Sequence, residues 1–124
     1  MNLNEAPEFT RDAKRLAKKW RSIPNDIQAA KVYIKPLYKN TSSDVDINTY
    51  RSEFFSGKRA AILHTDVDTE VVKMRLDVAD LGRNDRVRII FTAIKANDTI
   101  TFIELYAKNE KNREDDRRIK KYLT

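Results

Sequence analysis

The chain has 124 residues, and its 25 Lys and Arg against 19 Asp and Glu give a formal net charge of +6 at pH 7. This length fits one domain, 1–124, with a modest core, and the positive charge favours a polyanionic partner such as nucleic acid or an acidic protein. The absence of cysteine excludes disulfides and thiolate chemistry, and the single histidine, His64, excludes a multi-His metal site, so we predict no metal and no cofactor. No apolar run approaches the length of a membrane span and the N-terminus lacks a signal-peptide core, so we expect a cytoplasmic protein without membrane contact.

Two helices are predicted in the N-terminal third, after a segment, 1–8, that can either supply a brief edge strand or remain frayed. Thr10 is a candidate N-cap for a helix over 11–21, and a second helix over 25–35 should end before Pro36. A short turn would join them into a helix hairpin that packs on a sheet. The exposed side of the first helix is basic and is either solvated surface or a flank that follows RNA phosphates; it contains Arg11, Lys14, Arg15, Lys18, Lys19 and Arg21.

Residues 39–69 form an enlarged connection between the helices and the strands that follow. The segment is richer in acidic than in basic residues, yet it contains large apolar side chains such as Tyr50 and Phe54. It is therefore predicted to be partly helical or an extended flap. His64 lies in this connection, and we expect it to be structural or exposed.

Three consecutive strands are predicted between Glu70 and Lys108, because apolar and polar residues alternate there with a period of two. Turn residues at 96–99 make the second and third strands a hairpin, and an antiparallel meander is the simplest sheet. One face is apolar and is expected to be buried in the core. The other is predicted to stay uncovered and to hold an anion; its members are Lys73, Arg75, Arg86, Arg88, Phe102, Glu104, Tyr106 and Lys108.

A last helix is predicted to start after Asn112, since acidic residues occupy its first turn and Lys120 and Lys121 its last, matching the helix dipole. The predicted class is α+β, in which an N-terminal helix hairpin packs on an antiparallel meander and a C-terminal helix closes the chain.

This order of elements, with these sequence motifs, resembles the RelE/HigB-like toxins of bacterial and archaeal toxin–antitoxin systems, within the wider RelE/ParE superfamily. The resemblance covers both ends of the chain and the whole predicted sheet, but not the connection over 39–69. Its motifs are Pro7-Glu8-Phe9-Thr10-Arg11-Asp12 with the following 14–19, Val72-Lys73-Met74-Arg75-Leu76, Arg86-Val87-Arg88-Ile89-Ile90-Phe91, and 103–111 with the closing helix to Leu123.

The resemblance implies a toxin that is an mRNA interferase, a metal-independent endoribonuclease acting on mRNA, often on the ribosome, and neutralised by a cognate antitoxin. It matches Lys73 and Arg75 to a basic pair on the first strand. It matches Arg88 to the arginine that contacts the scissile phosphate, and Lys108 and Lys111 to a basic cluster after the last strand. A toxin–antitoxin hetero-oligomer is the expected assembly.

Cleavage of RNA by its own 2′-hydroxyl requires a base, stabilisation of the phosphorane and an acid. We assign Arg75 and Arg88 to the phosphorane, because arginine presents a planar fork of donors. Glu104 is the predicted base, and Tyr106 is predicted to orient the nucleotide or stack on it.

Lys73 or Lys108 is the predicted acid, provided that neighbouring cations lower its pKa. The competing interpretation is that Lys73, Arg75 and Glu104 form an ion-pair ladder on a solvated face. Further RNA-binding residues are predicted at the edge of the site, in the C-terminal basic cluster and on the first helix: Arg86, Lys111, Lys14 and Lys18.

Two alternatives remain open. One is a ParE-like toxin that binds DNA gyrase and has no nuclease activity. The other is a non-catalytic RNA- or partner-binding member of the superfamily. It is favoured because Glu114, Asp115 and Asp116 stand where a tyrosine is common, and Asp85, Arg86 and Val87 where a glycine pair is common.

Overall fold

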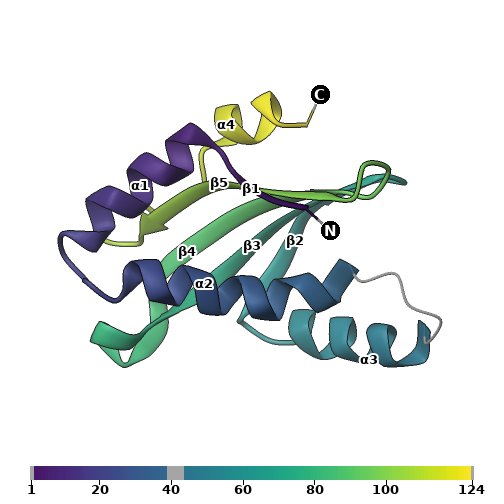
Figure 1. Ribbon diagram of the computed structural model, residues 1–124, viewed down its shortest axis with the longest axis horizontal. Helices are drawn as coiled ribbons and strands as arrows, with labels where there is room; N and C mark the ends of the chain where they lie inside the picture. The colour runs from purple at the N-terminus through teal and green to yellow at the C-terminus, as the bar shows by residue number, and fades with distance from the viewer. Residues whose placement is uncertain (1, 39–43, 124) are drawn as a thin grey trace.

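The described part of the chain folds into a five-stranded sheet with four α-helices, an α+β architecture as predicted (Figure 1). The computed structural model describes residues 2–38 and 44–123, and only the backbone of 44–48. None of the described helices is long and apolar enough to cross a membrane. The elements are β1 (Asn2–Glu5), α1 (Pro7–Ala17), α2 (Ile23–Ile34), the 3-10 helix η1 (Lys35–Tyr38), α3 (Asp44–Phe55), β2 (Ala60–Thr65), β3 (Thr69–Val78), the 3-10 helix η2 (Ala79–Leu81), β4 (Arg83–Ile94), β5 (Thr99–Ala107) and α4 (Asp116–Lys121).

The strands lie in the order β1-β5-β4-β3-β2. The predicted antiparallel meander is confirmed as β3, β4 and β5, and β1 supplies the predicted N-terminal edge strand, paired parallel to β5. In the register, Arg75 lies opposite Arg88, which lies opposite Tyr106. Directly opposite residues point to the same side of a sheet, so these three side chains form one row across it.

The prediction that side chains alternate strictly along the last strand is wrong, because β5 contains a bulge. Phe91 pairs with Phe102 and Ile90 with Glu104, so Ile103 is an extra residue. The bulge places Phe102 on the apolar face, where its ring lies 5.6 Å from that of Phe9.

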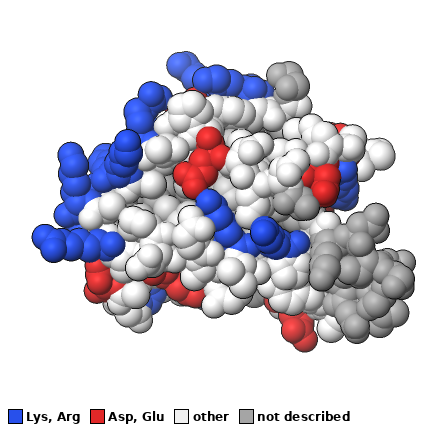
Figure 2. Space-filling model, in the orientation of Figure 1, with Lys and Arg blue, Asp and Glu red and all other residues white. Residues whose placement is uncertain are grey.

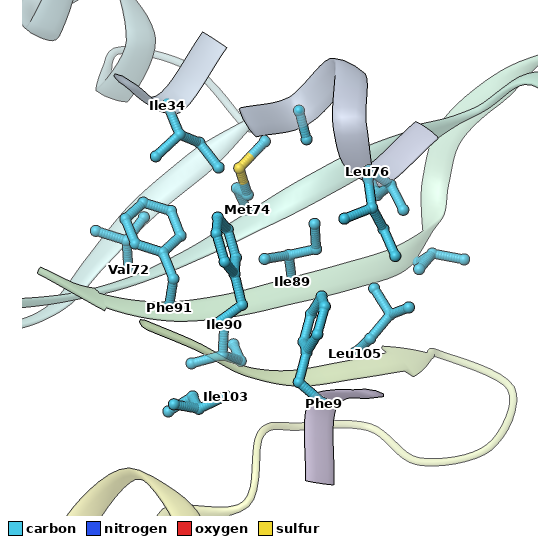
Figure 3. Packing of buried hydrophobic residues seen from close by; sticks show 14 of the residues in the cluster. Phe9, Ile34, Val72, Met74, Leu76, Ile89, Ile90, Phe91, Ile103 and Leu105 are labelled. Carbon is cyan, nitrogen blue, oxygen red and sulfur yellow. The ribbon is translucent and has the colours of Figure 1, made fainter. Parts of the chain in front are cut away.

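Helices α1 and α2 cover the apolar face of the sheet, which we call the helix face. Helix α1 packs mainly on β5 and α2 on β3. Phe9 and Ile34, both fully buried, point from these helices toward the strands (Figure 3). Helix α1 begins at Pro7, earlier than predicted, because proline suits the first helical position and Ala6 precedes it in extended conformation.

The connection over 39–69 contains the predicted partial helix, α3, and a strand that was not predicted, β2; residues 39–43 lie outside the described part of the chain. Glu70 of β3 connects the sheet to α3 through its carboxylate, which is almost fully buried. It accepts hydrogen bonds from Tyr38 (2.7 Å) and Arg51 (2.6 Å).

The second side of the sheet, which we call the basic face, carries Lys73, Arg75, Arg88, Glu104 and Tyr106. The prediction that it stays uncovered is wrong, because Arg88 is only 7% exposed and Glu104 and Tyr106 only 1%. Ile90 and Ile103 point to this side, away from Ile34 (Figure 3), and are fully buried.

Residues 108–115, the segment between β5 and α4, contribute to this burial because they make polar contacts with the sheet. The start predicted after Asn112 is wrong, since Asp115 is the N-cap and accepts from the backbone N–H groups of Arg117 and Arg118. The preceding Glu114 instead reaches back to Lys73.

Candidate anion-binding site

A cavity of about 200 Å³ opens beside the basic face, and its described lining contains six cations and no carboxylate. Its cationic residues come from three places in the chain: β3 and β4, the segment just before β2, and the residue after β5. They are Lys58, Arg59, Lys73, Arg75, Arg88 and Lys108. A concave site with this charge favours an anion.

Arg88 is the most unusual member of this set, because its guanidinium is buried and makes no ion pair with any described carboxylate. Its single hydrogen bond among the described residues is a long one, 3.4 Å, to the carbonyl of Val87. Burial lowers the pKa of Arg88, and the neighbouring Arg75 lowers it further. The folded protein therefore holds two guanidinium groups together with no described carboxylate paired to either, and a bound anion would relieve their repulsion.

Tyr106 completes the row on the other side of Arg88. Its hydroxyl is buried and makes no hydrogen bond to any other described residue. Burial raises the pKa of Tyr106, although the nearby Lys73 opposes that shift. The phenol is therefore neutral at pH 7 and keeps a proton to donate.

Lys73 is paired with the carboxylate of Glu114 at 2.9 Å. Burial alone would lower the pKa of Lys73, but Glu114 and Tyr106 outweigh it and the net pKa is raised. The predicted lowering of this pKa is wrong, because cations were expected around the ammonium and a carboxylate is there instead.

Glu104 lies beside the row but does not line the cavity. One carboxylate oxygen accepts the backbone N–H of Asp115 at 2.8 Å, and the other is paired with Lys111. In this arrangement Glu104 anchors the segment after β5. Its role as a base stays a prediction, and Lys111, predicted to bind RNA, is engaged with it.

The remaining predicted RNA-binding residues lie outside the cavity. Arg86 is partly exposed on β4, and its carbonyl accepts the N–H of Lys108 at 2.8 Å. Lys14 and Lys18 are exposed on α1, on the opposite side of the sheet, where Figure 2 shows basic side chains gathered over α1 and α4. Their roles stay predictions.

Lys58 and Arg59 were not predicted as site residues. They line the cavity because β2 pairs with β3 and brings the end of the connection beside Lys73 and Arg75. The only signal in the sequence was the pair of adjacent cations, since 60–65 shows no alternation.

No protein-family model and no curated protein matches this chain. Among solved structures, the archaeal RelE–RelB complex from Pyrococcus horikoshii OT3 is similar, with a TM-score of 0.45 and 9% identity, over 89% of this chain and 97% of that chain. Any assignment of function therefore depends on the residues of the site itself.

Proposed function

We propose that this protein is a RelE-like toxin, an mRNA interferase that binds an RNA phosphate in the cation-lined cavity and cleaves the chain beside it. The observation that carries the proposal is the buried guanidinium of Arg88, which has no carboxylate partner among the described residues and lies opposite Arg75. The cavity has room for a phosphate group and presents only positive charge to it. The sequence motifs that contain Lys73, Arg75 and Arg88 support the RelE-like reading.

In the proposed reaction a base, the role for which Glu104 stays the prediction, takes the proton of a 2′-hydroxyl. The 2′-oxygen forms a bond to the neighbouring phosphorus as the bond to the 5′-oxygen breaks. Negative charge grows on the non-bridging oxygens, and Arg75 and Arg88 stabilise it from a rigid sheet. The neutral Tyr106 hydroxyl and the Lys108 ammonium are the candidate donors to the leaving 5′-oxygen. The products are a 2′,3′-cyclic phosphate and a 5′-hydroxyl.

Two partners belong to this proposal. The substrate is mRNA, presented on the ribosome, so that the basic surface of α1 with Lys14 and Lys18 adds contacts to ribosomal RNA. The second partner is a cognate antitoxin whose acidic or amphipathic segment covers the cation-rich surface and forms a toxin–antitoxin hetero-oligomer.

The test is primer extension on a reporter message after brief induction of the wild type, Arg88→Met and Arg117→Met. Arg117 is an exposed arginine outside the cavity, so its replacement removes the same charge and serves as the matched control. We expect translation-dependent cuts in the wild type and the control, and none in Arg88→Met. Equal cutting by all three folded proteins would overturn the assignment of the site.

A non-catalytic RNA-binding protein is the second candidate, and one observation favours it: no described carboxylate or imidazole lines the cavity. Cleavage would then need water, or a group outside the lining such as Glu104, as the base for the 2′-hydroxyl. This candidate predicts salt-sensitive RNA binding that Arg88→Met weakens, with the RNA left intact. Growth arrest with DNA damage and intact message would instead indicate the gyrase-binding alternative.

A further inference from the structure

Strand β2 is an open edge of the sheet, with β3 on one side and no described strand on the other (Figure 1). Ile62 and Leu63 are each 40% exposed on it. Within 60–65 there is no lysine, arginine or carboxylate, the residues that usually protect an edge from pairing. Unprotected edges of this kind pair readily with another strand.

The opposite edge of the sheet is closed in two ways. Strand β1 pairs with the first half of β5. Beyond it, the N–H of Leu105 donates to Asp12 at 3.1 Å and the N–H of Ala107 donates to Glu110 at 3.2 Å. Among the described residues no comparable side chain caps the outer edge of β2, so the two edges differ in their readiness to pair.

The charges that flank β2 are self-complementary. Lys58 and Arg59 precede the strand, and Asp66 and Asp68 follow it. If two copies pair antiparallel about a two-fold axis through Leu63, each basic end meets the acidic end of the other copy. A parallel arrangement would instead place cation against cation and carboxylate against carboxylate.

We infer that two copies of this chain associate through antiparallel pairing of their β2 strands. The bulge at Leu63 interrupts the register with β3 and shortens the straight part of the edge, so the interface is small and the association weak. Pairing of this kind brings Asp68 of one copy opposite Lys58 of the other. Because Arg59 and Lys58 line the anion-binding cavity, dimerisation places an acidic turn beside its rim.

The chain has no cysteine, so single-cysteine variants report proximity directly. Leu63→Cys lies on the expected axis, opposite Leu63 of the other copy, where two β-carbons come close enough for a disulfide. Val32→Cys is the matched control, because Val32 is an apolar residue that is 67% exposed and belongs to α2 rather than to β2. Under mild oxidation we expect Leu63→Cys to form dimers on the order of tenfold faster, since association raises the local thiol concentration. Equal rates would overturn the inference.

Sedimentation of the unmodified chain supplies a second measurement. We expect a monomer–dimer equilibrium that shifts toward monomer when salt rises from about 0.05 to about 0.5 M, because the flanking charges become screened. Lys58→Glu should weaken the dimer, whereas Lys14→Glu, the same charge reversal on α1, should leave it unchanged. A chain that stays monomeric at all concentrations, or a dimer that responds to neither salt nor Lys58→Glu, would refute β2 pairing.

Discussion

Replacing Arg88 by methionine should stabilise the fold and abolish anion binding together. Methionine is unbranched and fills much of the volume of an arginine stem. It also removes the charge of Arg88, a residue that is only 7% exposed and has no described carboxylate partner. Exchanging a buried ion for a well-packed apolar side chain commonly stabilises proteins, and here the like charge of Arg75 opposite adds to the gain. We expect the free energy of unfolding to rise by about 1 to 3 kcal/mol.

Arg118→Met is the contrasting variant, because Arg118 carries the same group in the opposite setting. Its guanidinium is paired with the buried carboxylate of Asp12 at 2.6 Å and donates to the carbonyl of Ile103 at 3.2 Å. Removing it leaves Asp12 with Arg15 and the N–H of Leu105. We expect a loss of about 1 to 3 kcal/mol, so one substitution should give opposite signs at the two positions.

Urea denaturation with and without inorganic phosphate tests both statements. Phosphate at about 100 times its dissociation constant should stabilise the wild type by about 2.7 kcal/mol. It should stabilise Arg118→Met equally and Arg88→Met hardly at all. A destabilised Arg88→Met that still responds to phosphate would show that the guanidinium has a structural partner and that the anion binds elsewhere.

Three further predictions concern stability. Glu70→Gln should cost about 1 to 3 kcal/mol in urea denaturation, because it removes a buried charge that Arg51 contacts at 2.6 Å; an unchanged value would show that the pair contributes nothing. Phe9→Ala, in the centre of the core, should lower the free energy of unfolding by about 3 to 5 kcal/mol in the same assay. A smaller loss would mean that the surrounding core moves in to fill the space left by the ring. Hydrogen bonds from Tyr122 and Lys121 hold the pKa of Glu8 at about 2, against an ordinary 4.5, so its contribution is present above pH 4.5 and disappears as the pH falls toward 2. Wild type and Glu8→Gln should therefore differ in thermal stability at pH 6 and converge near pH 2; a difference that persists at pH 2 would contradict the linkage.

The alternation of side chains was enough to predict the centre of the molecule. Residues at every second position of β3 and β4 share a face, so the sequence alone predicts that Arg75 and Arg88 lie on one side of a sheet. Their direct opposition depends on register, which the hairpin turn and the apolar face set together. The predicted basic face therefore agrees with the structure at Lys73, Arg75 and Arg88.

The bulge at Ile103 shows where this reasoning fails. Beyond the bulge, the N–H of Leu105 faces the outer edge of β5 and donates to Asp12, which lies in α1. A contact between residues so far apart in the chain has no local sequence signal. The same reason explains the unpredicted burial of Glu104, which depends on the path of the segment around Asp115.

Strand β2 was missed for a different reason. An edge strand with one neighbour and few buried side chains needs no alternation, and only Ala60 within β2 is buried. The periodicity that identified β3 and β4 is therefore absent there. With β2 unplaced, the contribution of Lys58 and Arg59 to the cavity could not be predicted.

The parallel pairing of β1 with β5 has a consequence for how the chain reaches its fold. Asn2 pairs with Thr99, and Phe9 of α1 packs on Phe102, so β1 and α1 reach their native contacts only after β5 has been synthesised. Contacts of such long sequence separation slow folding, because the intervening loop must close before they form. Arg88 and Tyr106 likewise become neighbours only when β5 docks. The row of Arg75, Arg88 and Tyr106 therefore cannot assemble on a nascent chain that lacks β5, which delays any activity of this surface until β5 has been made.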